Sequence, residues 1–291
     1  MTDYCNHDLV GAHHLRHDTH ALEIIFDIMK SYPNGDQVPG LWITSPIHDD
    51  QGNLLGRTYS LPYPLPSFVD EFYPGMDPDD SNGEIALYYG GTYYDEAMPC
   101  TDPADHELRV GCFRAAELLY RHSAGKGNAV ANLCLGYVYS YDRCEGQYWV
   151  DPLDFKTQQE YWNYSYPREE RAYECLKLAA EADICEACYK LGDMCKHGTG
   201  CEPDVAEAFR WYLRASELSA YQRPVILGSV ALRLAGSYEE GLGCPQDFNR
   251  AMKWYQQAAA GLEVAFDNGE TWYEKALSRA KAGIKRCQQE A

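Results

Sequence analysis

The sequence predicts an all-α protein. We expect an α-solenoid of stacked antiparallel helix pairs, with about three repeats and a terminal helix, behind an irregular Pro- and Tyr-rich N-terminal region. Two observations predict this fold. The second part of the chain repeats with a period of 36 residues, which suits two short helices and their turns. The first 100 residues hold 9 of the 15 prolines, and proline interrupts helices, so long helices are not expected there.

The charge of the chain follows the same division. Residues 1–104 contain 17 acidic and 3 basic residues, so most of the formal charge of −19 belongs to this region. Phosphate binding needs clustered Lys and Arg, and such an acidic chain is therefore expected to bind neither nucleic acid nor a membrane. No apolar run of 18 residues and no apolar signal core are present, which predicts a cytoplasmic protein.

The N-terminal region, residues 1–104, is expected to contain one helix, a candidate β-hairpin and otherwise coil. The helix is predicted over His20–Ser31, with Asp18 and Thr19 as its N-cap. The hairpin strands are predicted at Leu41–Ser45 and Leu54–Tyr59, and a Pro- and Tyr-rich coil follows them.

Histidines near the N-terminus leave two interpretations open. If their segment is helical, His13, His17 and His20 share one face, and this spacing is common among zinc ligands. Otherwise His13 and His17 lie in a polar loop before the helix. A metal-binding protein or an enzyme with its site in the N-terminal 100 residues is therefore the alternative to a binding scaffold.

The solenoid is predicted over residues 105–262. Its anchor residues alternate at spacings of 19 and 17 residues, as in Ala172, Leu191 and Ala208. An insertion of 20 residues near 143–166 and one of 7 residues before Leu234 interrupt this period. Residues 263–291 are expected to form a C-terminal capping helix.

Each repeat is predicted to contain two kinds of helix. In one kind, Ala208 begins an apolar stripe at i, i+3, i+4 and i+7 that includes Trp211 and Tyr212, and Asp204 with Glu207 forms a capping-box pattern before it. In the other kind, small residues allow neighbouring helices to approach closely. The positions expected to be small or to end these helices are Ala187, Gly192, Gly198, Gly200, Gly241 and Gly243.

These residues are similar to the Sel-one-like repeat (SLR), a relative of the tetratricopeptide repeat. The family pattern, L-G-x-x-Y-x-x-G-x-G followed by D-x-x-x-A-x-x-W-Y-x-x-A-A, stands here as LGDMCKHGTGCEPDVAEAFRWYLRAS and LAGSYEEGLGCPQDFNRAMKWYQQAA. The first unit departs from it, with YDRCEG in place of the turn glycines, and Cys195 replaces the aromatic residue. The resemblance covers about 105–262 and implies an adaptor or scaffold for proteins or peptides, not a catalyst.

Cysteines in the repeats invite a metal interpretation that their spacing does not favour. Cys185 and Cys188 form a C-x-x-C motif, but Cys188 and Cys195 share the packing face of their helix. Cys201 and Cys244 occupy equivalent positions after the turn glycines. We therefore expect these cysteines to be reduced and to pack in the core.

Two surfaces are candidates for binding a protein or peptide. One is the strip opposite the packing face of the repeat helices, where the alternative is an ordinary solvated surface; its residues are Tyr137, Tyr141, Glu186, Lys190, Asp193, His197, Arg233 and Glu240. The other is the aromatic insertion, with Trp149 and Trp162, which could instead hold the N-terminal region against the solenoid. None of the common catalytic motifs for nucleophilic serine, zinc or phosphate chemistry occurs, so no catalytic residue, no cofactor and no enzymatic activity are expected.

Overall fold

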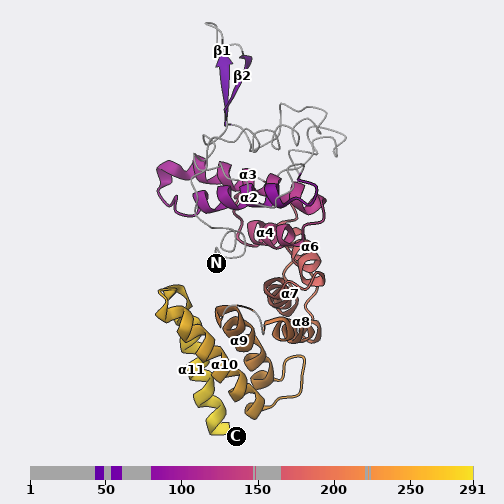
Figure 1. The fold of residues 1–291 in the computed structure, drawn as a ribbon, viewed down its shortest axis with the longest axis vertical. Helices are drawn as coiled ribbons and strands as arrows, with labels where there is room; N and C mark the ends of the chain where they lie inside the picture. The colour runs from indigo at the N-terminus through magenta and orange to yellow at the C-terminus, as the bar shows by residue number, and fades with distance from the viewer. Residues whose placement is uncertain are drawn as a thin grey trace. The chain divides into compact units, whose positions relative to one another are not determined.

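The computed structural model describes residues 43–48, 54–60, 80–146, 148, 165–219, 222 and 224–290. These residues form an all-α fold with one short β-hairpin, which confirms the predicted fold class (Figure 1). The chain divides into two compact units, unit 1 over residues 1–168 and unit 2 over residues 169–291.

The hairpin of unit 1 confirms the candidate hairpin in the sequence. Strand β1 (Ile43–His48) pairs antiparallel with β2 (Leu54–Ser60), and Ile43 lies opposite Ser60. The first strand begins two residues later than predicted. The helix predicted over His20–Ser31 lies outside the described residues.

Helix α2 (Glu84–Ala97) occupies a segment for which the sequence predicts coil, and that prediction is wrong. No proline interrupts this segment, and most of its residues are buried, many of them against α3 (His106–Gly125). Gly90 allows the two helices to approach, since a Cβ atom added there would lie 2.6 Å from the ring of Tyr120. Before the helix, the buried Asp80 carboxylate accepts a hydrogen bond of 2.8 Å from the N–H of Ile85. Helix α2 is thus an additional helix, packed on α3, that the period did not reveal.

Helix α4 (Ala129–Ser140) follows α3 in unit 1. The Asn128 side chain caps it by accepting hydrogen bonds from the N–H groups of Val130 and Ala131, at 3.0 and 3.3 Å. Asp142 has a φ of 47° in the turn that follows, at the position equivalent to Gly198. Aspartate tolerates this left-handed conformation better than most residues, so the YDRCEG turn forms without the first family glycine.

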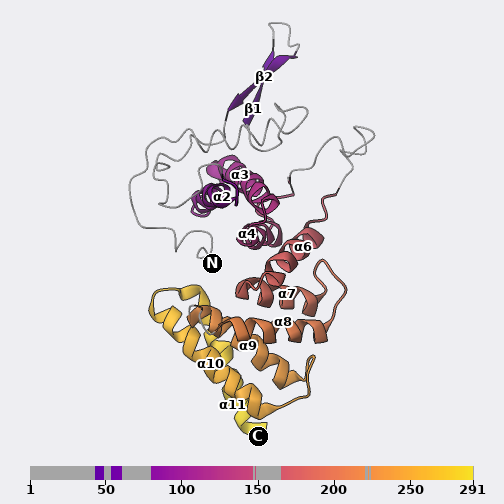
Figure 2. The ribbon, with the colours of Figure 1, turned by 45° about the vertical axis from the view of Figure 1, so that its right-hand side comes forward.

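Unit 2 is a series of helices in which neighbours in the chain are also neighbours in space (Figures 1 and 2). A short 3₁₀ turn (Thr271–Tyr273) precedes the last helix, which begins at Glu274 and not at residue 263 as predicted. The helices are α6 (Arg168–Glu181), α7 (Cys185–His197), α8 (Val205–Leu218), α9 (Pro224–Glu240), α10 (Phe248–Asp267) and α11 (Glu274–Glu290).

Glycine–tyrosine contacts set the spacing of the helix pairs in unit 2. A Cβ atom added at Gly192 of α7 would lie 2.5 Å from the ring of Tyr212 on α8. A Cβ atom at Gly283 of α11 would lie equally close to the ring of Tyr255 on α10. Both tyrosines are buried. The predicted role of Gly192 is therefore confirmed, and the same contact recurs at the C-terminal end of the unit.

The turns after α7 and α9 use glycine for two reasons. Gly200 and Gly243 have φ values of +71° and +73°, which confirms the predicted left-handed turns. A Cβ atom at these positions would also lie 2.1 Å from the carbonyl oxygen of Glu169 and 2.2 Å from that of Val205, respectively. Each turn therefore packs directly on the first residues of an earlier helix.

The cap of α8 confirms half of the predicted capping box. The Asp204 carboxylate accepts hydrogen bonds from the N–H groups of Ala206 and Glu207, at 2.9 and 2.8 Å. The return bond from Glu207 is not made. The N–H of Asp204 instead donates to the carbonyl oxygen of Cys195, and the Glu207 carboxylate pairs with Arg210.

The cysteines of the repeats pack as predicted. Cys185, Cys188 and Cys195 are free thiols with exposed fractions of 2% or less. Cys201 and Cys244 are half-buried, and their thiols donate to the carbonyl oxygens of Met194 and Ser237, at 3.7 and 3.5 Å. Burial raises the pKa of the Cys188 thiol to about 12, so it stays protonated at neutral pH.

A membrane-spanning helix would have to be both long and apolar, and no helix of the described residues meets that requirement.

Candidate functional site

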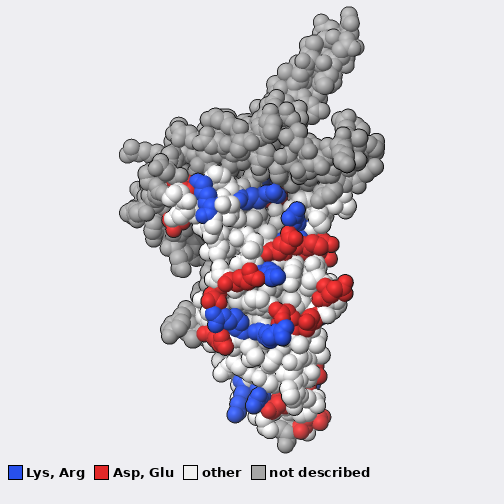
Figure 3. Space-filling view, turned by 90° about the vertical axis from the view of Figure 1, so that its right-hand side faces the viewer, with Lys and Arg blue, Asp and Glu red and all other residues white. Residues whose placement is uncertain are grey.

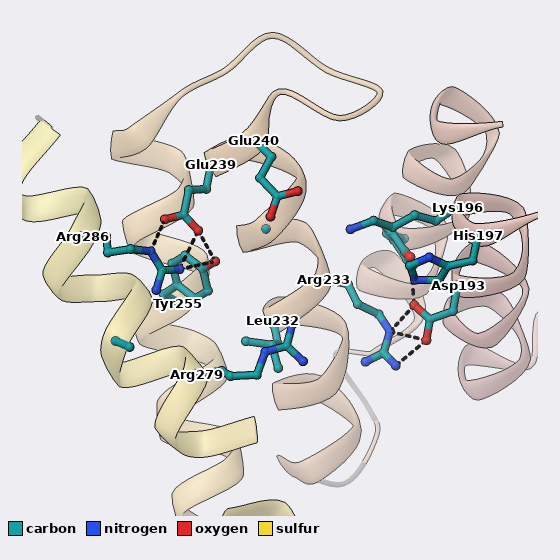
Figure 4. Close-up of a pocket in the computed structure, with 13 residues that line it drawn as sticks. Asp193, Lys196, His197, Leu232, Arg233, Glu239, Glu240, Tyr255, Arg279 and Arg286 are labelled. Carbon is teal, nitrogen blue, oxygen red and sulfur yellow. Dashed lines mark hydrogen bonds and ion pairs between the residues drawn. The ribbon is translucent and has the colours of Figure 1, made fainter. Parts of the chain in front are cut away.

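A pocket of about 500 Å³ lies in unit 2, where α7, α9 and α11 approach one another (Figure 4). Four of the residues predicted for the binding strip line it, namely Asp193, His197, Arg233 and Glu240. The other residues of its lining are Lys196 on α7, Tyr212 on α8, Leu232, Gly236 and Glu239 on α9, Tyr255 on α10, and Arg279, Ala282 and Arg286 on α11.

An ion pair between α7 and α9 forms one wall of the pocket. The Arg233 Nε donates to Asp193 Oδ1 and Oδ2, at 2.7 and 2.9 Å, and the Tyr212 hydroxyl donates to Oδ1 at 2.8 Å. Arg233 Nη1 also donates to the carbonyl oxygen of Ser229 at 2.8 Å. The guanidinium carbon lies 4.5 Å from the ring centroid of Tyr189, a cation–π distance. These contacts fix the orientation of both charged groups.

A second ion pair, between α9 and α11, forms the opposite wall. Arg286 donates to Glu239 twice, from Nε to Oε1 at 2.7 Å and from Nη2 to Oε2 at 2.8 Å. The Tyr255 hydroxyl donates to Glu239 Oε2 at 2.5 Å. Figure 4 shows this group and the Asp193–Arg233 pair on opposite sides of α9. Both pairs therefore consist of a carboxylate held by one arginine and one tyrosine.

The pairing changes the proton affinity of these groups. Burial alone would raise the pKa of Asp193, but the charge and hydrogen bonds of Arg233 outweigh it and lower that pKa below 3.8. The hydrogen bond from Arg286 lowers the pKa of Glu239 below its ordinary 4.5. Burial raises the pKa of both Tyr212 and Tyr255, and the neighbouring carboxylates add to the effect. At neutral pH the carboxylates are ionised and the tyrosines are neutral donors.

The sequence missed several lining residues for identifiable reasons. Tyr212 and Tyr255 belong to the apolar stripe, and the hydroxyl at the end of each ring donates to a carboxylate of the pocket lining. Lys196 lies three residues after Asp193, so a helical spacing from Asp193 would have found it. Arg279 and Arg286 lie on the capping helix, outside the repeat period, and no sequence signal pointed to them.

Two residues of the predicted strip in unit 2 lie outside the pocket lining. Glu186 accepts a hydrogen bond of 3.1 Å from the Tyr189 hydroxyl, and Lys190 Nζ lies 5.8 Å from the Tyr189 ring centroid. They pack around Tyr189, whose ring also contacts Arg233. They therefore support the wall of the pocket rather than line it.

The predicted strip in unit 1 is smaller than expected. Tyr137 is only 7% exposed because its ring stacks on Tyr141, with the centroids 5.8 Å apart. Tyr141 is 37% exposed. The Arg143 guanidinium lies over its ring, 5.2 Å from the ring centroid, and also lies 5.5 Å from the ring centroid of Tyr94. The expectation that Tyr137 is an exposed contact residue is therefore wrong, and Tyr141 is the exposed member of the pair.

The aromatic insertion is described at its two ends. The ring of Tyr148 stacks on that of Tyr166 at 4.7 Å, and its hydroxyl donates to Asp142 Oδ1 at 2.5 Å. These contacts close the base of the insertion. Trp149 and Trp162, which the sequence nominated for binding, lie outside the described residues.

The surface charge of the described residues is mixed. Figure 3 shows acidic and basic side chains intermixed on one face of these residues, without a continuous basic band there.

The predicted alternative was a metal site formed by histidines near the N-terminus. Within the described ranges, no cluster of three or more His, Cys, Asp or Glu residues could hold a metal ion. His13, His17 and His20 lie outside those ranges.

Comparisons with known proteins agree with the repeat pattern. A family model described as the Sel1 repeat matches residues 166–184, 185–219 and 229–261. No curated protein matches the sequence. Among solved structures, the crystal structure of a Sel1 repeat protein from Oxalobacter formigenes is similar, with 24% identity and a TM-score of 0.37 over 49% of this chain and 88% of that chain.

A second solved structure is a protective antigen present in uropathogenic Escherichia coli strains that displays an SLR fold. It has 18% identity and a TM-score of 0.34, and the match covers 72% of this chain and 46% of that chain. The present chain thus spans about half the length of that relative.

Proposed function

Because the chain is a Sel1 repeat protein, we propose that it is a non-catalytic scaffold whose unit 2 binds a protein or peptide in the pocket between α7, α9 and α11. The observation that carries this proposal is the pocket itself. It collects four residues that the sequence nominated for binding, on helices that the repeats hold side by side.

The construction of the pocket supports binding rather than simple packing. Its two ion pairs are restrained by the seven hydrogen bonds described above and a cation–π contact, so their side chains are ordered without a ligand. Binding to groups that are already ordered costs less conformational entropy than binding to mobile ones. A volume of about 500 Å³ is within the range of ligand pockets and can accept a few side chains of a peptide.

Gly236 provides a test that leaves the charges of the pocket unchanged. It lies on the pocket lining, and a Cβ atom added there would meet no other atom within 4 Å. Gly236→Leu would therefore fill part of the pocket, and leucine also favours a helix more than glycine does. Gly125→Leu is the matched control, since Gly125 is a helical glycine with equally open space in unit 1.

The assay uses the full chain and displayed random peptides of about 12 residues, a length that exceeds the pocket and its rim. Selected peptides are synthesised with a fluorophore and measured by fluorescence anisotropy. We expect Gly236→Leu to weaken binding at least about tenfold, whereas Gly125→Leu leaves it unchanged. Recovery of no peptide, or equal binding by Gly236→Leu and the original chain, would refute the proposal.

A further inference from the structure

We infer that the pocket of unit 2 recognises an acidic peptide segment and that Lys196 and Arg279 bind its carboxylates. This inference rests on the proposed peptide-binding function and names the chemistry of the partner. The evidence is the balance of hydrogen-bond donors and acceptors that line the pocket.

The acceptors of the two walls are already in use. Both oxygens of Asp193 accept from Arg233, and one of them also accepts from Tyr212. Both oxygens of Glu239 accept from Arg286, and one also accepts from Tyr255. The carboxylates are therefore neutralised by adjacent arginines and offer little attraction to a basic ligand.

Donors remain available on the rim. Lys196 and Arg279 line the pocket, and neither makes an ion pair or a hydrogen bond to another side chain of the described residues. An ammonium has three N–H donors and a guanidinium has five, and neither can accept a hydrogen bond. A ligand that satisfies both groups must therefore bring acceptors, and a negative charge makes those hydrogen bonds stronger.

The charges that line the pocket also favour an acidic ligand. Among the described ionised groups that line the pocket without a partner, two are cationic and one, Glu240, is anionic. The local excess of positive charge contrasts with the net charge of −19 of the whole chain. An acidic peptide would therefore be attracted to this pocket and repelled by much of the remaining surface.

A carboxylate can come from an Asp or Glu side chain or from the C-terminus of a peptide. Arginine binds either in a bidentate manner, and lysine binds either as a point charge, so the pocket chemistry is shared. The two sources differ in one respect that can be measured. Amidation of the C-terminus removes the terminal charge, whereas replacing Glu by Gln removes the side-chain charge.

The test uses the peptides selected on the full chain, each synthesised in three forms: the original, the form with Asn and Gln in place of Asp and Glu, and the C-terminally amidated form. Their binding is measured by fluorescence anisotropy with the original chain, Lys196→Gln, Arg279→Gln and the control Lys285→Gln. Lys285 is exposed on α11 and does not line the pocket.

We expect one neutral form to bind at least about tenfold more weakly than the original, and we expect Lys196→Gln and Arg279→Gln to remove most of this difference while Lys285→Gln retains it. Equal binding of all three forms, with Gly236→Leu still weakening them, would overturn the inference and leave the proposed function standing. If Gly236→Leu has no effect on any form, the proposed function itself fails.

Discussion

Gly243 offers a sharp test of how the repeats are packed. It lies in the turn after α9 with a φ of +73°, and a Cβ atom added there would lie 2.2 Å from the carbonyl oxygen of Val205 and 2.7 Å from the Cβ of Phe209. Gly241 lies in the same turn with a φ of +68°, yet its nearest contact would be 3.4 Å away, to the Cβ of Gln246. The two glycines therefore share a backbone conformation and differ in the space around them.

The expected free-energy changes follow from this difference. An alanine in the left-handed region costs about 1–2 kcal/mol, and this cost applies at both positions. The gain from a less flexible unfolded chain, about 0.4–1 kcal/mol, also applies to both. Only Gly243→Ala adds a collision with backbone, which cannot rotate away, and overpacking of this kind costs about 1–3 kcal/mol more.

The assay is urea unfolding followed by far-UV circular dichroism, with hydrogen exchange at the amides of α8 and α9 to locate the effect. We expect Gly243→Ala to lose about 1–5 kcal/mol and Gly241→Ala about 0–2 kcal/mol, with the larger loss of protection at the start of α8. If the two variants were equally destabilised, the turn would not pack on Val205 and the reasoning would be wrong.

Three further predictions concern the ion pairs and a helix cap. A double-mutant cycle of Asp193→Asn and Arg233→Gln, measured by urea unfolding, is expected to give a coupling of about 1.5–3 kcal/mol, because the hydrogen bonds involve two charged groups that are mostly buried; a value near zero would contradict the paired geometry. Glu239 has a lowered pKa, so its stabilising contribution is complete above the ordinary 4.5 and is lost as the pH falls through the lower folded-state value; unfolding free energies measured across that range should fall less steeply for Glu239→Gln. Asn128→Ala removes the cap of α4 and should cost about 1 kcal/mol in thermal unfolding, and an unchanged melting temperature would exclude the cap.

The regular part of the solenoid could be predicted because each local signal agreed with the period. Asp204 caps α8, the turn glycines adopt positive φ values, and Gly192 contacts the next helix, as their positions in the repeat indicate. The seven-residue insertion before Leu234 was visible as a spacing, but its structure was not. Part of it lengthens α9, which begins ten residues before Leu234, whereas α7 begins six residues before the equivalent Leu191.

Helix α2 was missed because proline density was applied to a segment that contains none. The last proline before it is Pro78 and the next is Pro99, so residues 84–97 are free to form a helix. Its tyrosines belong to the segment predicted as a Pro- and Tyr-rich coil, although Tyr89 and Tyr93 are spaced four apart and are both buried. A search for apolar and aromatic residues at helical spacing, rather than the composition of the region, would have predicted this helix.

The candidate pocket was only partly predictable, because it depends on where the ends of long side chains lie rather than on backbone positions. The tyrosine of each W-Y pair has a ring that packs against a glycine, Gly192 for Tyr212 and Gly283 for Tyr255, and a hydroxyl that donates to a carboxylate on the pocket wall. The repeat period predicts the position of the tyrosine ring. It does not predict the position of the carboxylate, because Asp193 lies two residues after the anchor Leu191 and Glu239 lies five residues after the next anchor, Leu234. The two carboxylates thus have the same kinds of partner although they occupy non-equivalent positions in the repeat. In each case the arginine comes from the second helix after the one that carries the carboxylate, α9 for α7 and α11 for α9. Repeat packing therefore positions the tyrosines, the tyrosines and arginines position the carboxylates, and Lys196 and Arg279 are the groups that we propose for binding a ligand carboxylate.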